Sequence, residues 1–280
     1  MDISTQNFAI LNPTLIENGQ TLVLNFDHGK ANEMGSNTLR AWESVTAALH
    51  QGQIRSVIAT SERLSRSGKP IFIAGADVTE RTGWSNEDVK THVRWQRSVL
   101  TALRQAPVFF CGLAHGVALG WGTEFLLCCD YRIATKTARF GLPETSLGIL
   151  PGAGGTSELW MEIGVAHAMR LGMTGEQIGS AEALRIGLVQ EETATYGEGY
   201  ERLLTLCQLA NRRSPSALSA FKKGLLATRG QSSESRQHIE ATAYEHCVDA
   251  GDAAVGRAHF KEIIGGQTPP WSPFKDFSAQ

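Results

Sequence analysis

The chain has 280 residues, of which 42% are hydrophobic, and its formal net charge is −2. This length and apolar content allow a substantial core, and the near-neutral charge argues against nucleic acid or an anionic membrane as a partner. No apolar run is long enough to span a bilayer, the N-terminus lacks the features of a signal peptide, and the five cysteines fit neither a disulfide framework nor a metal site. The composition therefore predicts a soluble, reduced, cytoplasmic protein.

Strands and helices are expected to alternate up to about residue 195. Residues 1–20 are polar and are expected to be loosely held. Apolar patterning predicts strands at 21–26, 55–60, 70–74, 108–113, 131–134, 138–140 and 188–189. Helices are predicted to begin near Ser36, to cover 86–104 and 124–130, to pass through 159–163, and to cover 166–173 and 180–185.

Beyond residue 200 the pattern is almost entirely helical. Helices are predicted at about 200–211, 214–228, 233–249 and 253–264, and the prolines after residue 268 exclude a helix from the tail. Alternating elements followed by helices indicate an α/β core at 1–200 and a helical region at 201–280.

A glycine-rich stretch, 116–124, connects the predicted strand 108–113 to an apolar helix. The first backbone N–H groups of a helix have no intrahelical partner, and the helix dipole adds positive potential at that end. Such a turn suits an oxygen that gains negative charge during a reaction. Glu124 lies at the start of this helix, and an acid among apolar residues is costly to bury without a partner or a use.

A second acid, Glu144, follows a proline at a turn, and two acids near one helix start are typical of acid–base catalysis. Spacing alone does not bring them together, and Glu124 could simply stabilise its own helix. The glycine-rich segment 152–155 lacks the Lys-Ser/Thr of a phosphate-binding loop, so it is interpreted as a structural turn.

Three segments, 71–78, 116–124 and 140–156, together resemble the crotonase superfamily, most closely the enoyl-CoA hydratases. The resemblance covers about residues 20–265. It implies an α/β fold, a crotonase-like spiral of ββα units, followed by a helical trimerisation region. It also implies a homotrimer or a dimer of trimers, and an acyl-CoA thioester as substrate.

The resemblance also implies the site. The backbone N–H groups of Ala76 and Trp121 would form an oxyanion hole, and Glu124 and Glu144 would be catalytic. Contacts with CoA or substrate would come from Lys30, Ala31, Ala74, Gly75, Asp77, Val78 and Gly120, and Phe260 would close the CoA site of a neighbouring subunit. No metal or other cofactor is implied, because CoA is part of the substrate.

The implied reaction is hydration of a 2-enoyl-CoA, in which Glu124 deprotonates water and Glu144 protonates C2. Isomerisation, decarboxylation, hydrolysis and a non-catalytic RNA-binding or scaffold role remain alternatives. One departure from the family is Trp121, where relatives have glycine. Either its backbone is strained, or its ring fills part of the acyl site and narrows the substrate range.

Overall fold

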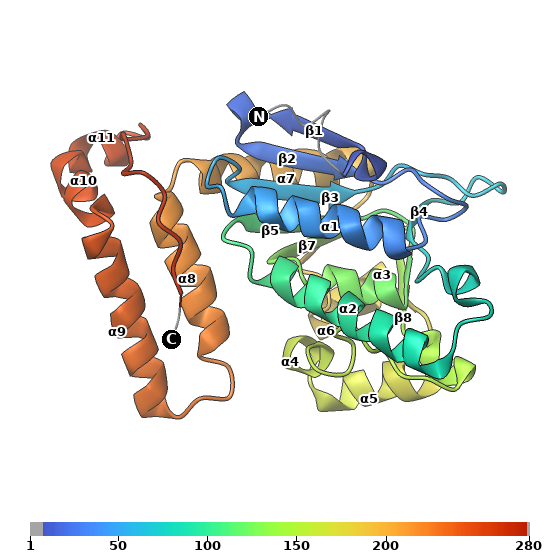
Figure 1. Ribbon diagram of the computed structural model, residues 1–280. Helices are drawn as coiled ribbons and strands as arrows, with labels where there is room; N and C mark the ends of the chain where they lie inside the picture. The colour runs from blue at the N-terminus through green and yellow to red at the C-terminus, as the bar shows by residue number, and fades with distance from the viewer. Residues whose placement is uncertain (1–7, 279–280) are drawn as a thin grey trace.

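Two sheets organise the computed structural model, which describes residues 8–278 (Figure 1). The larger sheet has the strand order β1 (Pro13–Ile16), β2 (Thr21–Asn25), β3 (Ser56–Thr60), β5 (Phe109–Ala114), β7 (Tyr131–Thr135) and β10 (Glu191–Thr193). The smaller has the order β4 (Ile71–Ile73), β6 (Val117–Leu119), β8 (Arg139–Gly141) and β9 (Ile178–Gly179). Apart from the antiparallel pairs β1–β2 and β8–β9, the pairings are parallel, and the fold is α/β with two mixed sheets.

Helices cover both faces of the larger sheet. Helices α1 (Ser36–Leu49) and α2 (Asn86–Arg104) lie side by side over one face, and α7 (Tyr196–Asn211) lies on the other (Figure 1). The main core lies on the α1 and α2 side, where Trp42 packs against Phe125 with ring centroids 4.8 Å apart. A smaller core buries Leu203 and Cys207 of α7 against the sheet.

The remaining helices lie near the smaller sheet or to one side of the core. Near the smaller sheet lie α3 (Trp121–Leu126), α4 (Leu159–Ile163), α5 (Val165–Thr174) and α6 (Ser180–Ile186). Short 3-10 helices are η2 (Ala9–Leu11), η3 (Glu17–Gly19), η4 (Val78–Arg81) and η5 (Pro143–Leu147). To one side stand α8 (Pro215–Ala227), α9 (Ser233–Asp249), α10 (Asp252–Ala258) and α11 (Phe260–Ile264), with the C-terminal segment running between α8 and α9 (Figure 1).

A buried lysine fastens the α8–α9 hairpin to the core. Lys222 Nζ of α8 donates to Asp130 Oδ2 at 2.8 Å and to the carbonyl of Val108 at 3.0 Å. The boundary predicted after residue 200 falls inside α7, which packs on the sheet, so α8 is the first helix to leave the core. The division into 1–200 and 201–280 stays a prediction.

The helix predicted at 86–104 is confirmed over its full length, since α2 spans Asn86–Arg104. Ser85 and Asp88 form a capping box that stabilises its start. Several other predictions were wrong in detail. Residues 13–16 are not loose but form β1, an edge strand that tolerates Pro13 at its first position. The glycine-rich turn contains the short strand β6.

Three helix or strand boundaries also differ. The helix predicted at 124–130 is α3, which begins at Trp121 and ends at Leu126. The strand predicted at 188–189 lies at 191–193, where it pairs with β7. The helix predicted at 253–264 is divided into α10 and α11 by His259, whose φ of −105° and ψ of 21° are not helical. Within residues 8–278, no helix combines the length and hydropathy that crossing a membrane requires.

Candidate active site

A cavity of about 230 Å³ lies where β4 ends and α3 begins, and helix α2, η5 and the segment before residue 153 complete its walls. Eight of the residues predicted for the site line it together: Ala74, Gly75, Ala76, Val78, Gly120, Trp121, Glu124 and Glu144. The three sequence segments that carry the family resemblance therefore meet at one place.

Glycines allow the turn into α3 to approach β4 closely. Gly120 has a φ of +52°, a conformation that L side chains rarely adopt. A Cβ on Gly122 would lie 2.2 Å from the carbonyl oxygen of Ile73, so only glycine fits there. Thr123 Oγ1 donates to the carbonyl of Ala118 at 2.7 Å and thereby ties the helix start to β6. These contacts fix the first turn of α3 against the end of β4.

The backbone N–H groups of Ala76 and Trp121 are available at this junction. Ala76 follows Gly75, whose φ is +128°, and it is held by a parallel bridge to Met34. Within residues 8–278, no hydrogen bond uses the N–H of Ala76 or of Trp121. Both residues line the cavity, so two unpaired donors border the space in which a substrate carbonyl could lie.

Glu124 is buried and held by the chain's second glycine-rich segment. Its Oε1 accepts from the N–H of Ala153 at 2.7 Å and from the N–H of Gly155 at 2.9 Å. Burial raises the pKa of Glu124, while these two hydrogen bonds act to lower it. The interpretation of 152–155 as a structural turn was therefore incomplete, because the turn also clamps a carboxylate.

Glu144 is held differently. It is the second residue of η5, after Pro143, and its Oε1 lies so close to Gly120 that a Cβ there would be 2.6 Å away. Its Oε2 is buried without a hydrogen-bond partner among the described residues. Burial, followed by the negative charge of Glu124, raises the pKa of Glu144 to about 7. This carboxyl group can hold a proton near neutral pH and release it.

Four predicted site residues do not line the cavity. Lys30 and Ala31 lie in a loop beside it, where the carbonyl of Ala31 accepts from the N–H of Ala74 at 3.1 Å. The carboxylate of Asp77 accepts from the N–H of Thr79 at 2.9 Å and so caps η4. Phe260 is 61% exposed on α11. The binding roles of all four stay predictions.

Sequence reasoning missed several residues that line the same cavity. They are Arg81, Val93, Gln96, Pro143, Leu147, Ile149, Leu150 and Gly152. Val93 and Gln96 lie three positions apart on α2 and so share a helix face. Their helical spacing in the sequence could have placed Val93 and Gln96 on one face of a helix. It could not have indicated that this face lies against the cavity.

The structure distinguishes the two hypotheses for Trp121. The positive φ falls on Gly120 and not on Trp121, so the hypothesis of backbone strain was wrong. Trp121 lines the cavity, and its indole ring is buried in the main core and stacks on Phe125 with ring centroids 5.6 Å apart. The hypothesis that the ring fills part of the acyl site and narrows the substrate range stays a prediction.

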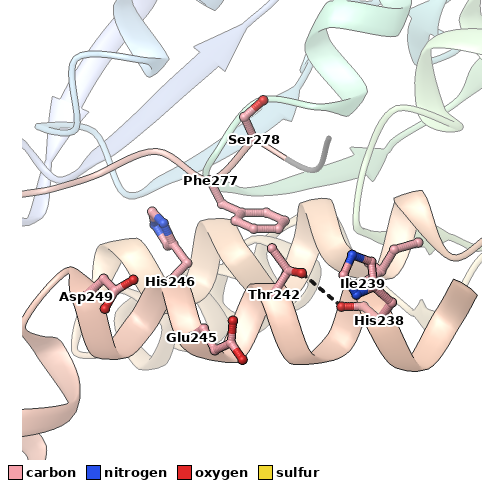
Figure 2. Close-up of a pocket in the computed structure, with 8 residues that line it drawn as sticks. All are labelled: His238, Ile239, Thr242, Glu245, His246, Asp249, Phe277 and Ser278. Carbon is pink, nitrogen blue, oxygen red and sulfur yellow. Dashed lines mark hydrogen bonds between the residues drawn. The ribbon is translucent and has the colours of Figure 1, made fainter.

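Figure 2 shows a different cavity, of about 370 Å³, between α9 and the C-terminal segment. Two histidines and two acids line it, but His246 Nε2 bonds the carbonyl of Lys275 at 3.0 Å, and its ring packs edge-on against Phe277. This histidine anchors the C-terminal segment. His115, at the end of β5, similarly bonds Thr135 Oγ1 at 3.0 Å, as expected for a structural histidine.

Comparisons with known proteins agree with this geometry. The family model for enoyl-CoA hydratase/isomerase matches residues 22–271. The chain is 31% identical to probable enoyl-CoA hydratase 2, mitochondrial, of Arabidopsis thaliana over 264 residues, 94% of this chain and 86% of that protein. It is 32% identical to a probable enoyl-CoA hydratase of Bacillus subtilis over 245 residues, 86% of this chain and 92% of the relative.

Among solved structures, the fold is similar to that of an enoyl-CoA hydratase from Bacillus anthracis. The TM-score is 0.83 at 29% identity, over 94% of this chain and 100% of the other. The Arabidopsis relative is named as mitochondrial, so the cytoplasmic location stays a prediction. The similarity extends from sequence to fold and covers the segments that build the cavity, and the chain belongs to the enoyl-CoA hydratase/isomerase family.

Proposed function

We propose that the protein is an enoyl-CoA hydratase, which adds water across the C2=C3 bond of a 2-enoyl-CoA thioester. The observation that carries this proposal is that Glu124 and Glu144 line one cavity, in which two backbone N–H groups bind Oε1 of Glu124 and the buried Oε2 of Glu144 has no partner among the described residues. Burial raises the pKa of both groups, but only Glu124 has two backbone hydrogen bonds that act to lower it, and this inequality suits the separate roles of base and acid.

The backbone donors have the first role. When water attacks C3, charge moves onto the thioester oxygen, and the N–H groups of Ala76 and Trp121 would donate to it. Donors positioned in advance contribute about 3–4 kcal/mol each to transition-state stabilisation. The close contact of Gly122 with Ile73 supports this role, because it holds the chain segments that carry both donors in a fixed relation.

Glu124 would bind and deprotonate the attacking water. Its Oε1 is occupied by two backbone donors, whereas no hydrogen bond within residues 8–278 uses Oε2. The two hydrogen bonds stabilise the charged form, which a base requires. The free oxygen would then receive the proton as the water oxygen bonds to C3.

Glu144 would supply the second proton. With a pKa of about 7, a useful fraction is protonated near neutral pH, and the buried Oε2 has no competing protein partner. Transfer of its proton to C2 completes the addition, so that the product gains one hydrogen at C2 and one hydroxyl at C3. Deprotonation of Glu124 to solvent and reprotonation of Glu144 would restore the starting state.

The test is hydration of crotonyl-CoA by the purified chain, followed as loss of the enoyl-thioester absorbance. Hydration supports the proposal. A 3-enoyl-CoA assayed in parallel tests the isomerase alternative, and conversion of that substrate alone would replace hydratase by isomerase. Salt-dependent retention of RNA without turnover of either thioester would favour the binding role.

We further propose that the chain assembles as a trimer or a dimer of trimers. Helices α8 and α9 expose Phe221 (74%), Leu225 (58%) and Tyr244 (72%), and an apolar surface of this kind is typical of an interface. Light scattering after gel filtration should give three or six times the chain mass of 30.3 kDa. A monomer would rule this assembly out.

A further inference from the structure

One corner of the cavity is polar, and the proposed reaction makes no use of it. It is formed by Glu80 and Arg81 of η4 with His92 and Gln96 of α2, and Arg81 and Gln96 line the cavity itself. We call these four residues the polar corner. Apart from Glu144, the other side chains of α2, η5 and the following segment at the cavity are apolar, among them Val93, Leu147, Ile149 and Leu150.

Arg81 brings a cation to the cavity without a matching anion. No carboxylate of the described residues lies within 4 Å of its guanidinium group, and its Nε is buried without a hydrogen-bond partner. Burial lowers the pKa of Arg81, which reflects the cost of holding its charge there. An arginine remains charged even so, and its planar group is suited to binding a carboxylate with two hydrogen bonds.

Gln96 adds a second free donor. Its side chain is 3% exposed, and its Oε1 accepts from Arg81 Nη2 at 3.4 Å. Because an arginine only donates, this contact turns the amide oxygen towards Arg81 and leaves Nε2 as the free end. Nε2 is buried with no partner among the described residues. A buried donor left unpaired is destabilising, so the side chain is arranged for a group that brings its own acceptor.

The neighbouring acids are Glu80 and Asp77, each of which accepts hydrogen bonds through one oxygen only, and Oε1 of Glu80 is buried without a hydrogen-bond partner among the described residues. Glu80 Oε2 accepts from the N–H of Ser36 at 2.9 Å, and its Oε1 lies 3.3 Å from His92 Nε2. The carboxylate of Asp77 is occupied by the N–H and hydroxyl of Thr79. These acids offset part of the positive charge of Arg81 at a distance, but neither supplies the missing acceptor.

We infer that Arg81 and Gln96 bind a carboxylate at the far end of the acyl group. The preferred substrate would then be the 2-enoyl-CoA of a short dicarboxylic acid. This inference rests on the proposed function, because it places the acyl group in the cavity that holds Glu124 and Glu144. A plain hydrocarbon chain would leave both donors without an acceptor, and a site built to hydrogen-bond a polar group discriminates strongly against analogues that lack it.

A binding experiment tests this inference without relying on turnover. Titration calorimetry would compare glutaryl-CoA and adipyl-CoA, which end in a carboxylate, with pentanoyl-CoA and hexanoyl-CoA, their methyl-ended counterparts. All four lack the double bond and cannot be hydrated. The wild-type chain should bind the better carboxylate ligand roughly 10- to 100-fold more tightly than its counterpart, the range expected of hydrogen bonds to a charged group.

Variants assign the preference to named residues. Arg81→Met should abolish the preference and leave binding of pentanoyl-CoA within about threefold, and Gln96→Leu should reduce the preference partly. The matched control is Arg94→Met, which removes the same charge from an exposed position on α2, the helix that carries Gln96; Arg94 pairs there with Glu87 at 3.0 Å. It should keep the full preference. Arg81→Met should still fold, because the one hydrogen bond of the described residues that it removes is the 3.4 Å contact with Gln96, and Arg81→Lys should retain part of the preference.

The outcomes separate the two proposals. Equal binding of carboxylate- and methyl-ended ligands, or a preference that survives Arg81→Met, overturns the inference. Hydration of 2-pentenoyl-CoA but not of glutaconyl-CoA also overturns it and leaves the hydratase proposal standing. If glutaryl-CoA is preferred and neither enoyl-CoA is hydrated, the carboxylate site stands and the hydratase proposal fails.

Discussion

The two glutamates of the site occupy regions built in opposite ways. Glu124 lies on α3 inside the core, and backbone donors from the segment after Pro151 bind one of its oxygens. Glu144 lies on η5, a short 3-10 helix whose residues are partly or fully exposed, and one of its oxygens is buried without a partner. The described chain thus supplies hydrogen-bond donors to the carboxylate of Glu124 and none to the buried oxygen of Glu144.

This difference shows how one residue type can serve two roles. Hydrogen bonds from backbone N–H groups favour the charged form of Glu124, against the effect of its burial. No such donors reach Glu144, and the charge of Glu124 adds to the effect of burial there. The proposed roles of base and acid rest on this difference in hydrogen bonding, because burial raises the pKa of both groups.

The largest expected effect comes from removing the proton donor. Glu144→Gln should lower the rate of crotonyl-CoA hydration by about 10²- to 10⁴-fold, because an amide cannot supply the proton that C2 requires. The enoyl-thioester absorbance measures this loss. Glu87→Gln, at an exposed position outside the cavity, is the control and should leave the rate unchanged. A Glu144→Gln rate within threefold of the wild type would remove Glu144 from the mechanism.

Glu124 should contribute more than Glu144 to the stability of the folded chain. Glu124→Ala leaves the N–H groups of Ala153 and Gly155 without an acceptor and should lower the free energy of unfolding by about 2–4 kcal/mol. Glu144→Ala breaks no hydrogen bond of its carboxylate in the described chain and should change that free energy by less than about 1 kcal/mol. Urea titrations of both variants measure the difference. Equal losses of unfolding free energy in the two variants would contradict the difference between the two carboxylates.

A smaller effect is expected at the glycine that holds α3 against β4. Gly122→Ala places a methyl group where the carbonyl of Ile73 already lies, and should cost about 1–3 kcal/mol of stability. It should also slow hydration, because the segments that carry both oxyanion donors are pushed apart. Gly172→Ala, in open space on α5, is the matched control and should be neutral or stabilising by up to about 1 kcal/mol. Similar melting curves for the two variants would contradict the steric argument.

The pH profile gives the finest test. In the proposed reaction Glu144 acts in its protonated form, so kcat/KM should fall as the pH rises through about 7. Glu124→Gln removes the neighbouring negative charge, and in the residual activity of that variant the midpoint should move to lower pH. An unchanged midpoint would mean that the two acids are not coupled.

The same raised pKa has a consequence for stability. The folded chain keeps the Glu144 proton between its ordinary pKa of 4.5 and about 7, whereas the unfolded chain releases it. The stabilisation from this group is therefore complete below pH 4.5 and is lost as the pH rises to about 7. Glu144→Gln should remove this part of the pH dependence, which urea titrations at several pH values would show.

Local signals in the sequence were sufficient for some features and not for others. Helix α2 was predicted at its exact bounds because a capping box and a regular apolar spacing mark it without reference to the rest of the chain. Strands β6 and β9 have three residues and two residues, too few for any periodicity to register. They exist because neighbouring strands pair with them.

The site was predicted in its parts but not in its connections. The residue pattern identified Glu124 and Glu144 as candidates, and the family resemblance indicated Ala76 and Trp121. That Gly155 donates to Glu124 could not be predicted, because the two residues meet only when the chain folds back over α3. Arg81 and Gln96 were missed because an arginine and a glutamine among polar neighbours look solvated until their burial is known.

The two backbone hydrogen bonds to Glu124 give this residue a structural role that could be conserved independently of catalysis. A descendant that abandoned catalysis would still need an acceptor for the amides of Ala153 and Gly155, so selection for a folded chain alone could preserve Glu124. No hydrogen bond within residues 8–278 imposes the same demand on the carboxylate of Glu144. The residue aligned with Glu144 is therefore the better marker for distinguishing active members of the family from members that have lost activity.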